Sequence, residues 1–149
     1  MSESMSGITD PTEEYFKDGL WGWNGTQWRK LNLLFGYSGP YSELKSNTNV
    51  PAGTFTLAGS TVPAGEVWVV YGMSGYVVST SCNIIQFGFW NGAYGIICRH
   101  IKPPASYLVY DYQGTIVLAA GYYPFLKMYS MTEGDDAYLY AWGYKMKVT

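Results

Sequence analysis

The single histidine of the chain, His100, stands two residues after a cysteine, Cys98. A thiol beside an imidazole is the pairing that activates a cysteine nucleophile, so these residues are the first place to look for catalysis. The surrounding run is β-like, and residues two apart on a strand share one face at about 7 Å. That separation is beyond hydrogen-bond reach, and the neighbouring cations Arg99 and Lys102 disfavour a charged imidazole. We therefore expect a structural or solvent-exposed histidine rather than a Cys-His dyad.

Carboxylates are the remaining candidates for acid-base chemistry, since a pair of them could act as in a glycosidase. They are Glu66, Asp111, Glu133, Asp135 and Asp136. The last three lie together in a sequence typical of a hairpin turn, where a calcium ion is the alternative to a plain turn. The chain has no Gly-x-Ser-x-Gly element, no phosphate loop and no dinucleotide fingerprint. We predict no catalytic residue, no metal and no cofactor.

Three tryptophans stand close together around an Asn-Gly pair in LWGWNGTQWRKL, residues 20–31. Asn-Gly between alternating aromatic residues is the strongest short signal for a β-hairpin. A two-residue type I′ loop would pair Trp23 with Thr26, and Trp21 with Trp28. These four side chains would then share one face of a two-stranded ribbon.

A three-residue loop would instead pair Trp23 with Gln27, and Trp21 with Arg29, which offers a cation–π contact. We prefer the two-residue register. Either ribbon needs cover, because two strands alone are marginally stable in water. Three partners for the tryptophan face stay open: the chain's own domain, a neighbouring copy, or a sugar stacked on the rings.

Charged side chains are scarce in this chain, and aromatic ones are abundant. Asp, Glu, Lys and Arg make up 13% of its 149 residues, whereas aromatic residues make up 18%, with 15 Tyr and 6 Trp. Because such a small number of charged side chains cannot cover the surface, we expect Tyr, Ser, Thr, Asn and Gly to be exposed. Tyr and Trp are enriched at protein interfaces, so this surface is suited to contact with other proteins. A net charge of −2 without a basic stripe gives no support to nucleic-acid binding.

The first residues, MSESMSGITDPTEEYF, lack the apolar centre of a signal peptide, and no run approaches the roughly 20 apolar residues of a membrane helix. We therefore expect a protein made in a cytoplasm, not exported by a signal peptide and without a membrane partner. Two cysteines, Cys82 and Cys98, fit a reducing compartment. If Asn91-Gly92 closes a two-residue hairpin, they are not directly opposite, which favours buried free thiols over a disulfide.

The elements that carry these residues are strands, preceded by a polar segment. Residues 1–18 predict an extended N-terminal arm, which Tyr15 and Phe16 could anchor. Residues 19–38 hold the Trp-rich hairpin and a connection, and residues 39–149 hold one β domain. In that domain, Gly- and Pro-rich turns separate short β-branched and aromatic runs. We expect strands at 41–47, 54–58, 66–79, 83–90, 93–101, 106–111, 115–118, 123–131 and 137–147.

Many short strands with turns between them predict an all-β sandwich or barrel. In the last strand, five large side chains share one face, namely Tyr138, Tyr140, Trp142, Tyr144 and Met146. The opposite face holds smaller or polar residues, namely Leu139, Ala141, Gly143 and Lys145. We expect the larger set to point inward at the Trp142 end, with a division between core and interface as the alternative.

The hairpin LWGWNGTQWRKL resembles the short Trp-Asp/Asn-Gly-x-x-Trp-x-x-Leu hairpins of tailed-bacteriophage virion proteins, which occur in head and tail-fibre parts. The later runs TVPAGEVWVVYGMS, IVLAAGYYPFLKMY and DDAYLYAWGYKM are similar to those of small phage β-sandwich proteins of the capsid decoration and head-fibre kind. The resemblance covers about residues 20–36 and 61–146. Tyr122-Tyr123-Pro124 departs from the polar residues expected after the preceding glycine.

The resemblance implies an all-β, jelly-roll-like β-sandwich, present in many copies on a virion that is assembled in the host cytoplasm. It implies a non-enzymatic capsid decoration protein that stabilises the shell by contacts with the major capsid protein or another virion protein. Such proteins often act as homotrimers. The contact residues that we assign lie in the arm and the hairpin: Tyr15, Phe16, Trp21, Trp23, Trp28 and Arg29.

Two alternative functions stay open. A phage tail-fibre or receptor-binding protein would use the same fold with an exposed ligand loop, for which the candidate residues are Trp90, Asn91, Tyr110, Asp111 and Tyr112. A carbohydrate-binding β-sandwich module would be a soluble monomer whose tryptophan fluorescence changes when oligosaccharide is added.

Overall fold

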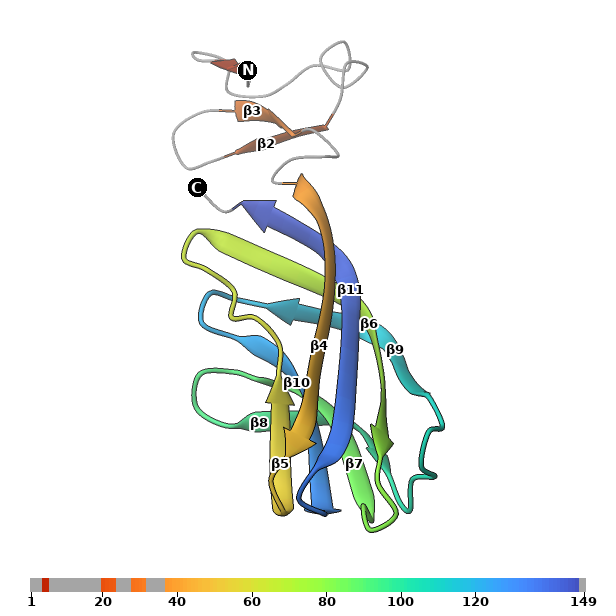
Figure 1. Ribbon diagram of the computed structural model, residues 1–149. Helices are drawn as coiled ribbons and strands as arrows, with labels where there is room; N and C mark the ends of the chain where they lie inside the picture. Colours follow the sequence, from red (N-terminus) through yellow and green to blue (C-terminus); the bar gives the residue numbers. More distant parts are fainter. Residues whose placement is uncertain (1–3, 6–19, 24–27, 32–36, 148–149) are drawn as a thin grey trace. The chain divides into compact units, whose positions relative to one another are not determined.

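The computed structural model describes residues 4–5, 20–23, 28–31 and 37–147, with side chains described from residue 38 onward. All regular secondary structure in these ranges is β-strand (Figure 1). The chain divides into two compact units, Met1–Gly36 and Tyr37–Thr149. The hydrophobic core described for the protein lies in the second unit.

The first unit contains a three-stranded antiparallel sheet in the order β1-β3-β2. Its strands are β1 (Ser4–Met5), β2 (Leu20–Trp23) and β3 (Trp28–Leu31). Trp23 lies opposite Trp28, and Trp21 lies opposite Lys30. Both registers that we predicted for this hairpin are therefore wrong. Four residues, rather than the predicted two or three, separate the paired positions Trp23 and Trp28 in the sequence.

The predicted arm, residues 1–18, is described at two positions. Ser4 and Met5 pair with Arg29 and Trp28 of β3, so this part of the arm extends the hairpin by a third strand. The rest of the arm, which includes Tyr15 and Phe16, lies outside the described residues.

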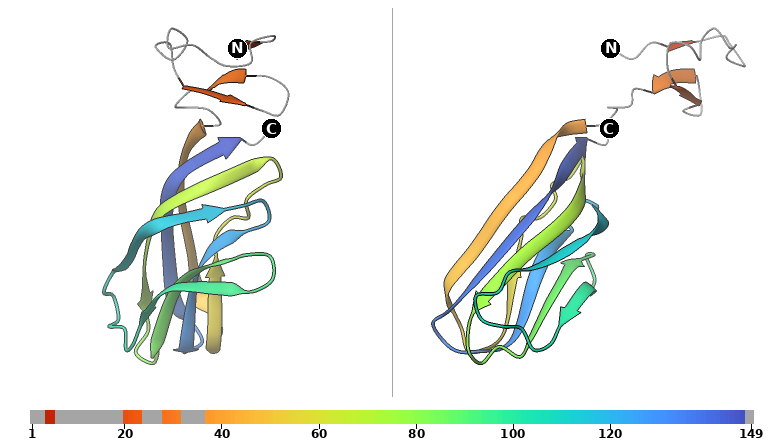
Figure 2. Two further views of the ribbon diagram at one scale, coloured as in Figure 1. Left: turned by 180° about the vertical axis from the view of Figure 1, so that it is seen from behind. Right: turned by 90° about the vertical axis from the view of Figure 1, so that its right-hand side faces the viewer.

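The second unit contains eight strands in two four-stranded antiparallel sheets, ordered β4-β11-β6-β9 and β5-β10-β7-β8. The strands are β4 (Tyr37–Val50), β5 (Gly53–Ala58), β6 (Glu66–Val78), β7 (Ile84–Trp90), β8 (Gly95–Ile101), β9 (Tyr110–Leu118), β10 (Tyr123–Met131) and β11 (Asp135–Lys147). Figure 2 shows the two sheets face to face.

The strand pairing is nested from the ends of this unit towards its middle. β4 pairs with β11, β5 with β10, β6 with β9 and β7 with β8, each antiparallel. The first and third pairs lie in one sheet, and the second and fourth pairs lie in the other. This arrangement of four nested antiparallel pairs is the topology of a jelly roll. The predicted fold class, an all-β jelly-roll-like β-sandwich, is confirmed.

Alternating side chains of both sheets fill the space between them. Val70, Met73 and Leu139 come from one sheet and Phe87 and Leu126 from the other, and each is at most 1% exposed. Full burial of such a side chain contributes about 1.5–3 kcal/mol to stability. Among the tyrosines whose side chains are described, only one is buried. The core is therefore mainly aliphatic, and most tyrosines are left for the surface.

Most strands lie within a few residues of their predicted ranges, but β9 differs. We predicted two strands, 106–111 and 115–118, separated by a turn at Gln113-Gly114. β9 instead runs unbroken through this turn and stays paired with β6 through a register shift. Gly114 fits a strand here because the Tyr112 phenol occupies the space that a Cβ would need. The glycine that suggested a turn is thus explained by side-chain packing.

Candidate interaction surface

The outward side of β11 carries the largest side chains of that strand. Successive residues of a strand point to opposite faces. Ala137, Leu139 and Ala141 point into the core, each at most 1% exposed. The aromatic residues that alternate with them point outward, namely Tyr138, Tyr140, Trp142 and Tyr144. The prediction that the larger set points inward at the Trp142 end is therefore wrong.

Trp142 lies on the outer side because the neighbouring strand leaves space for it there. Gly72 of β6 lies opposite Trp142 in register, and a Cβ added to Gly72 would come within 3.0 Å of three indole atoms. On the core side of β11, the adjacent positions are the small Ala141 and Gly143. A Cβ on Gly143 would collide with the Val69 carbonyl group. Ala141 and Gly143 thus lie on the side of β11 where space is limited. The Trp142 indole lies on the outer side, where it covers Gly72.

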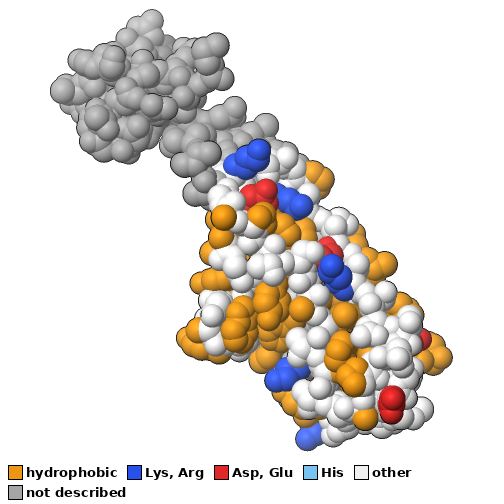
Figure 3. Space-filling view, turned by 60° about the vertical axis from the view of Figure 1, so that its left-hand side comes forward, with side chains coloured by type: hydrophobic (Ala, Val, Ile, Leu, Met, Phe, Trp, Pro, Cys, Tyr) orange, Lys and Arg blue, Asp and Glu red, His pale blue; other side chains and the backbone are white. Residues whose placement is uncertain are grey.

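All four strands of this sheet contribute side chains to the surface around these rings. Leu44 of β4 is 66% exposed, Tyr71 of β6 is 50%, Val117 of β9 is 60% and Tyr140 of β11 is 39%. We call this surface the aromatic face; it consists of Leu44, Tyr71, Tyr76, Val117, Tyr138, Tyr140, Trp142 and Tyr144. Figure 3 shows exposed hydrophobic side chains over one side of the molecule, with some Lys, Arg, Asp and Glu side chains among them.

The rings of the aromatic face are in mutual contact. Tyr76 of β6 and Tyr138 of β11 are stacked, with ring centroids 4.5 Å apart and planes inclined by 17°. Tyr140 and Trp142 are stacked along β11, with centroids 5.4 Å apart and planes inclined by 26°. Rings that already hold one another lose little further freedom when a partner binds, so the face is preorganised.

The eight side chains of the aromatic face are uncharged. Their polar atoms are the indole N–H and phenol oxygens, one of which, on Tyr140, forms a 3.0 Å hydrogen bond with the Ser42 hydroxyl. Burial raises the pKa of the Tyr138 phenol, and nearby Asp136 raises it further, so this phenol is neutral at physiological pH. The carboxylates of Asp136 and Asp111 lie at the margin, on the ends of β11 and β9.

The loop between β8 and β9 exposes a second apolar surface, which we call the apolar tip. Its members are Tyr107, Leu108 and Val109, which are 71%, 52% and 59% exposed. The Tyr107 N–H donates to the Val77 carbonyl over 3.0 Å, and the Ala105 N–H donates to the Tyr110 hydroxyl over 2.9 Å. Tyr107 has a φ of 63°, a left-handed conformation that bulky residues seldom adopt. The loop is thus held in a conformation that exposes three apolar side chains in a row.

Trp90 and Asn91, the first part of the predicted ligand loop, lie where β7 turns into β8. The Trp90 ring stacks on Tyr123 of β10, with centroids 6.3 Å apart. The Asn91 side-chain oxygen accepts hydrogen bonds from the backbone N–H groups two and three residues later, so it shapes the turn. Trp90 lies opposite Gly95. Four residues therefore connect the strands, and the two-residue turn predicted at Asn91-Gly92 is wrong.

Tyr110, Asp111 and Tyr112, the second part of the predicted ligand loop, begin β9. An Asp111 carboxylate oxygen lies 3.4 Å from Arg99 Nη1 in an exposed ion pair, and such pairs contribute about 0–1 kcal/mol. The Tyr112 phenol forms a hydrogen bond with the Cys98 thiol. Of the contacts described for these residues, none joins them to the β7–β8 turn. The structure thus places the two parts of the predicted loop in separate environments.

A β-bulge separates the side chains of Cys98 and His100. β8 pairs with β7 through a register shift, so Cys98 packs against the core and His100 is exposed. The Gln86 amide donates a 3.0 Å hydrogen bond to His100 Nδ1. Burial raises the pKa of the Cys98 thiol. The prediction that both side chains share one strand face is therefore wrong, and both Cys82 and Cys98 are free thiols.

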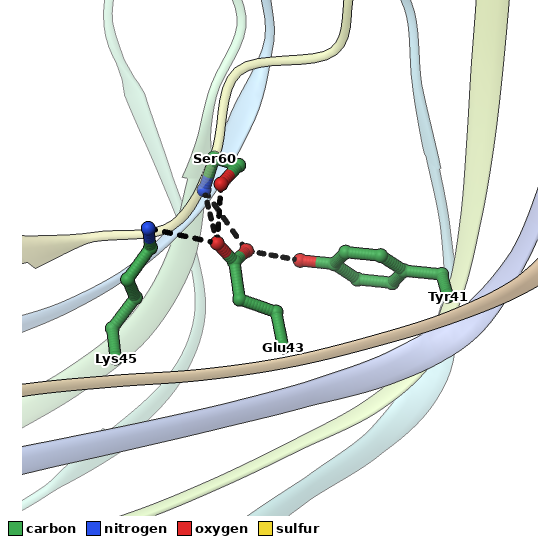
Figure 4. Close-up of polar contacts among 4 residues, drawn as sticks. All are labelled: Tyr41, Glu43, Lys45 and Ser60. Atoms are coloured by element: carbon green, nitrogen blue, oxygen red, sulfur yellow. Dashed lines mark hydrogen bonds and ion pairs between the residues drawn. The ribbon is translucent and has the colours of Figure 1, made fainter.

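Glu43 of β4 accepts hydrogen bonds from two directions (Figure 4). The Tyr41 hydroxyl donates over 2.7 Å, the Ser60 N–H over 2.9 Å, and the Ser60 hydroxyl donates as well. Lys45 Nζ lies 3.1 Å away. Burial opposes the charge of this carboxyl, but the bonds from Ser60 and Tyr41 outweigh it and lower its pKa. This Glu43 clamp (Tyr41, Glu43, Lys45 and Ser60) ties β4 to the β5–β6 loop and is a structural feature.

Three of the five carboxylates considered for chemistry, Glu66, Asp111 and Asp135, have structural partners. An Asp135 carboxylate oxygen accepts a 2.7 Å hydrogen bond from the Thr132 N–H, and a Glu66 oxygen accepts one from the Trp68 indole. Among the residues whose side chains are described, no group of three or more His, Cys, Asp or Glu is placed to hold a metal ion. The described ranges also contain no helix long and apolar enough to cross a membrane.

The six residues assigned to a neighbour contact fall in the first unit. Trp21, Trp23, Trp28 and Arg29 lie in β2 and β3, and their side chains are outside the described residues, as are Tyr15 and Phe16 altogether. Their role in binding stays a prediction.

The apolar tip and the Glu43 clamp were not predicted from the sequence. The run Tyr107-Leu108-Val109, shortly after Pro103-Pro104, was a usable signal for the tip, because a loop that buries nothing rarely carries three large apolar residues in succession. No local signal marked Glu43, since its partner Ser60 is 17 positions away.

Comparisons with known proteins give a structural likeness but no match to a family or to a curated protein. Among solved structures, the chain is similar to the core of NLP from Drosophila, whose crystal structure is described in terms of pentamer formation and histone binding. The two share 10% identity with a TM-score of 0.32, and the match covers 74% of this chain and 100% of that one. A likeness at this level says nothing of what this chain binds.

Proposed function

We propose that this chain is a non-enzymatic structural protein of a virus particle, and that it acts as a capsid decoration protein by binding other protein subunits. The observation that carries this proposal is the aromatic face, a preorganised and uncharged surface on a rigid sheet. The jelly-roll topology is compatible with it, since viral capsid proteins commonly use this fold. The resemblance of the Trp hairpin and of three strand-forming runs to phage virion proteins points in the same direction.

The chemistry of the aromatic face suits protein recognition. Tyrosine offers a large contact area at a low cost in conformational entropy, and serine beside it offers adaptable hydrogen bonds. Tyr140 and Ser42 combine both on adjacent strands. Leu44 adds an aliphatic side chain directly opposite Tyr140 in register. A surface of this kind gains stability when it is covered, and it lacks the basic groups that a nucleic acid would require.

The proposed partners are the major capsid protein or another virion protein, together with further copies of this chain in a closed oligomer such as a trimer. The arm and hairpin residues Tyr15, Phe16, Trp21, Trp23, Trp28 and Arg29 form the second proposed contact. Such a protein would be found in the virion after assembly in the host cytoplasm. Closed association would also protect the outer strands of each sheet, which otherwise invite aggregation.

The proposal is tested on virus particles released by cells that carry this gene. An antibody raised against residues 37–149 is coupled to gold and applied to the particles for electron microscopy. Gold over the head supports a decoration protein. Gold confined to the tail favours a fibre or receptor-binding protein, and particles without gold, from cells that make the chain, would contradict a virion role.

A second candidate function is glycan binding by a tail-fibre or carbohydrate-binding protein. One observation favours it: Trp90 and Tyr123 form a stacked pair beside the polar β7–β8 turn. Sugar rings stack on such aromatic surfaces, and indole emission reports the contact. A change in tryptophan fluorescence on adding oligosaccharide, lost in Trp90→Ala, would support this function over capsid decoration.

A further inference from the structure

We infer that the aromatic face and the apolar tip together form a contact surface for a second copy of this chain. This inference rests on the proposed structural function and names the partner of its main surface. It differs from the contact assigned to the arm and hairpin, because all of its residues lie in the β-sandwich.

The aromatic face and the apolar tip are continuous. The tip residue Tyr107 donates its backbone N–H over 3.0 Å to the carbonyl of Val77 in β6, the residue that follows Tyr76 of the face. Tyr110, whose hydroxyl holds the tip loop, lies opposite Gly75 of β6, next to Tyr76 of the face. One apolar surface therefore extends from the β8–β9 loop across β6 and β11.

The exposed area is large enough for a stable contact between two proteins. Its most exposed members are Leu44, Tyr71, Tyr107, Leu108, Val109, Val117 and Tyr140, which are 39–71% exposed. Since an aromatic side chain offers about 150–250 Å² and Leu or Val somewhat less, these seven expose on the order of 700 Å². That exceeds the roughly 300–600 Å² of the largest apolar patch on a typical monomer, and it approaches the roughly 800 Å² that each partner of a stable interface buries.

The charge distribution favours an identical partner. In a symmetric pair of copies, a charged group close to the twofold axis meets the same group of the other copy and is repelled by it. The face and the tip contain no charged group; at the margin lie Asp111, which is paired with Arg99, and Asp136. A partner that is recognised by its charge would find no counter-charge here. Phenols, hydroxyls and aliphatic groups are complementary to the same groups on a second copy.

The surface is also held in place before any partner arrives. Its strands are in the regular ladder of a four-stranded sheet, its rings are stacked in pairs, and backbone hydrogen bonds hold the tip. Little conformational entropy is therefore lost on association, so the area estimated above would translate into affinity with a small ordering penalty.

The test is the mass of the full chain in solution, measured by light scattering across about 1–100 µM, a range that covers micromolar affinity. The face variant is Leu44→Lys with Tyr140→Lys, which puts two charges on adjacent outward positions. The matched control is Tyr94→Lys with Ile96→Lys, two exposed apolar residues of the β7–β8 hairpin at 64% and 37% exposure. We expect the wild type and the control to form an oligomer, and the face variant to dissociate at least about 100-fold more readily.

Circular dichroism will show whether the protein with both lysine substitutions folds. If it does not, a milder variant still tests the inference. Leu44→Ser with Val117→Thr removes apolar area without adding charge, and we expect it to weaken association about tenfold. A third variant, Tyr107→Ser with Leu108→Ser, tests the tip in the same way. Unchanged association in all three folded variants would overturn the inference.

Failure of this inference and failure of the proposed function give different results. A wild type that stays monomeric up to about 100 µM overturns the second-copy contact but leaves binding to another virion protein in place. An oligomer that the face variants leave intact also overturns it, and moves the contact to other residues. The third outcome is that virus particles bind no gold while the face variants dissociate the oligomer. This result overturns the virion role and supports the second-copy contact.

Discussion

The indole ring of Trp142 covers Gly72 on the neighbouring strand, so closely that a Cβ on the glycine would lie within 3.0 Å of three ring atoms. The same ring stacks on Tyr140, one of the exposed members of the aromatic face. The absence of a side chain at position 72 thus decides where a tryptophan on the next strand lies. It links the stability of the sheet to the arrangement of its outer surface.

Gly72→Ala is expected to displace the Trp142 ring. We expect the free energy of unfolding to fall by about 1–3 kcal/mol, as for other substitutions that overfill a packed site. Urea denaturation followed by tryptophan fluorescence measures this loss. Ser74→Ala is the control on the same strand, since it adds no atom, and should change stability by no more than about 0.5 kcal/mol. Equal losses in the two variants would contradict the proposed packing.

Glu43→Gln is expected to lower the free energy of unfolding at neutral pH by about 1–3 kcal/mol, because it weakens charged hydrogen bonds at a half-buried site. The affected donors are the Tyr41 hydroxyl and both Ser60 groups. Denaturant unfolding at pH 7 is the measurement. Glu133→Gln removes the same charge from an exposed turn and serves as the control; a similar loss in this control would show a general charge effect.

The Glu43 clamp also predicts a dependence of stability on pH. The pKa of Glu43 is lowered in the folded protein, so its contribution is fully present above the unfolded value of about 4.3. It is lost as the pH falls below that value and through the folded pKa, because the folded state then has to take up a proton. Wild type and Glu43→Gln should therefore converge in stability towards low pH. A constant difference from pH 7 down to the acid transition would contradict this.

Ser130→Gly is expected to stabilise the protein. Ser130 has a φ of 60°, where a residue with a Cβ is strained by about 1–2 kcal/mol. Glycine removes this strain, but it costs about 0.5–1 kcal/mol of stability because it loses more conformational entropy on folding. A net gain of about 0.5 kcal/mol should appear in thermal and denaturant unfolding. Ser130→Ala keeps the Cβ, so it should not share the gain.

Both thiols are expected to react slowly in the folded protein. Burial raises the pKa of Cys82 and of Cys98, so the reactive thiolate is scarcer at pH 8 than in a free thiol. Alkylation followed by mass spectrometry should be about tenfold slower than for glutathione, and unfolding in guanidinium should remove the difference. Two alkylated cysteines without prior reduction would agree with free thiols, whereas none after unfolding would indicate a disulfide.

Removal of residues 1–36 is expected to leave a folded protein. Both four-stranded sheets and the described core belong to Tyr37–Thr149. The truncated chain should keep the β-sheet circular dichroism and the cooperative unfolding of the full chain. A truncated chain without cooperative unfolding would mean that the first unit contributes to the fold of the second.

The sequence by itself determined the local elements of this protein. Alternating apolar residues and Gly- or Pro-rich turns are short-range signals, so β10 was predicted at its observed bounds, 123–131, and most other strands within a few residues. The same periodicity correctly put Tyr138, Tyr140, Trp142 and Tyr144 on one face of the last strand. The scarcity of charge correctly predicted exposed tyrosines.

Only the tertiary structure decided whether this aromatic side of β11 points into the core or outward. Both sides of β11 carry apolar residues, so its orientation depends on its neighbours. Gly72 leaves space for Trp142 on the outside, and the smaller Leu139 and Ala141 fill the core side. Trp23 pairs with Trp28 and Trp90 pairs with Gly95, so four residues separate the members of each pair, a spacing that the Asn-Gly signal did not specify. Glu43 and Ser60 meet across 17 positions, because contacts between distant residues follow from how the sheets roll together rather than from any local pattern.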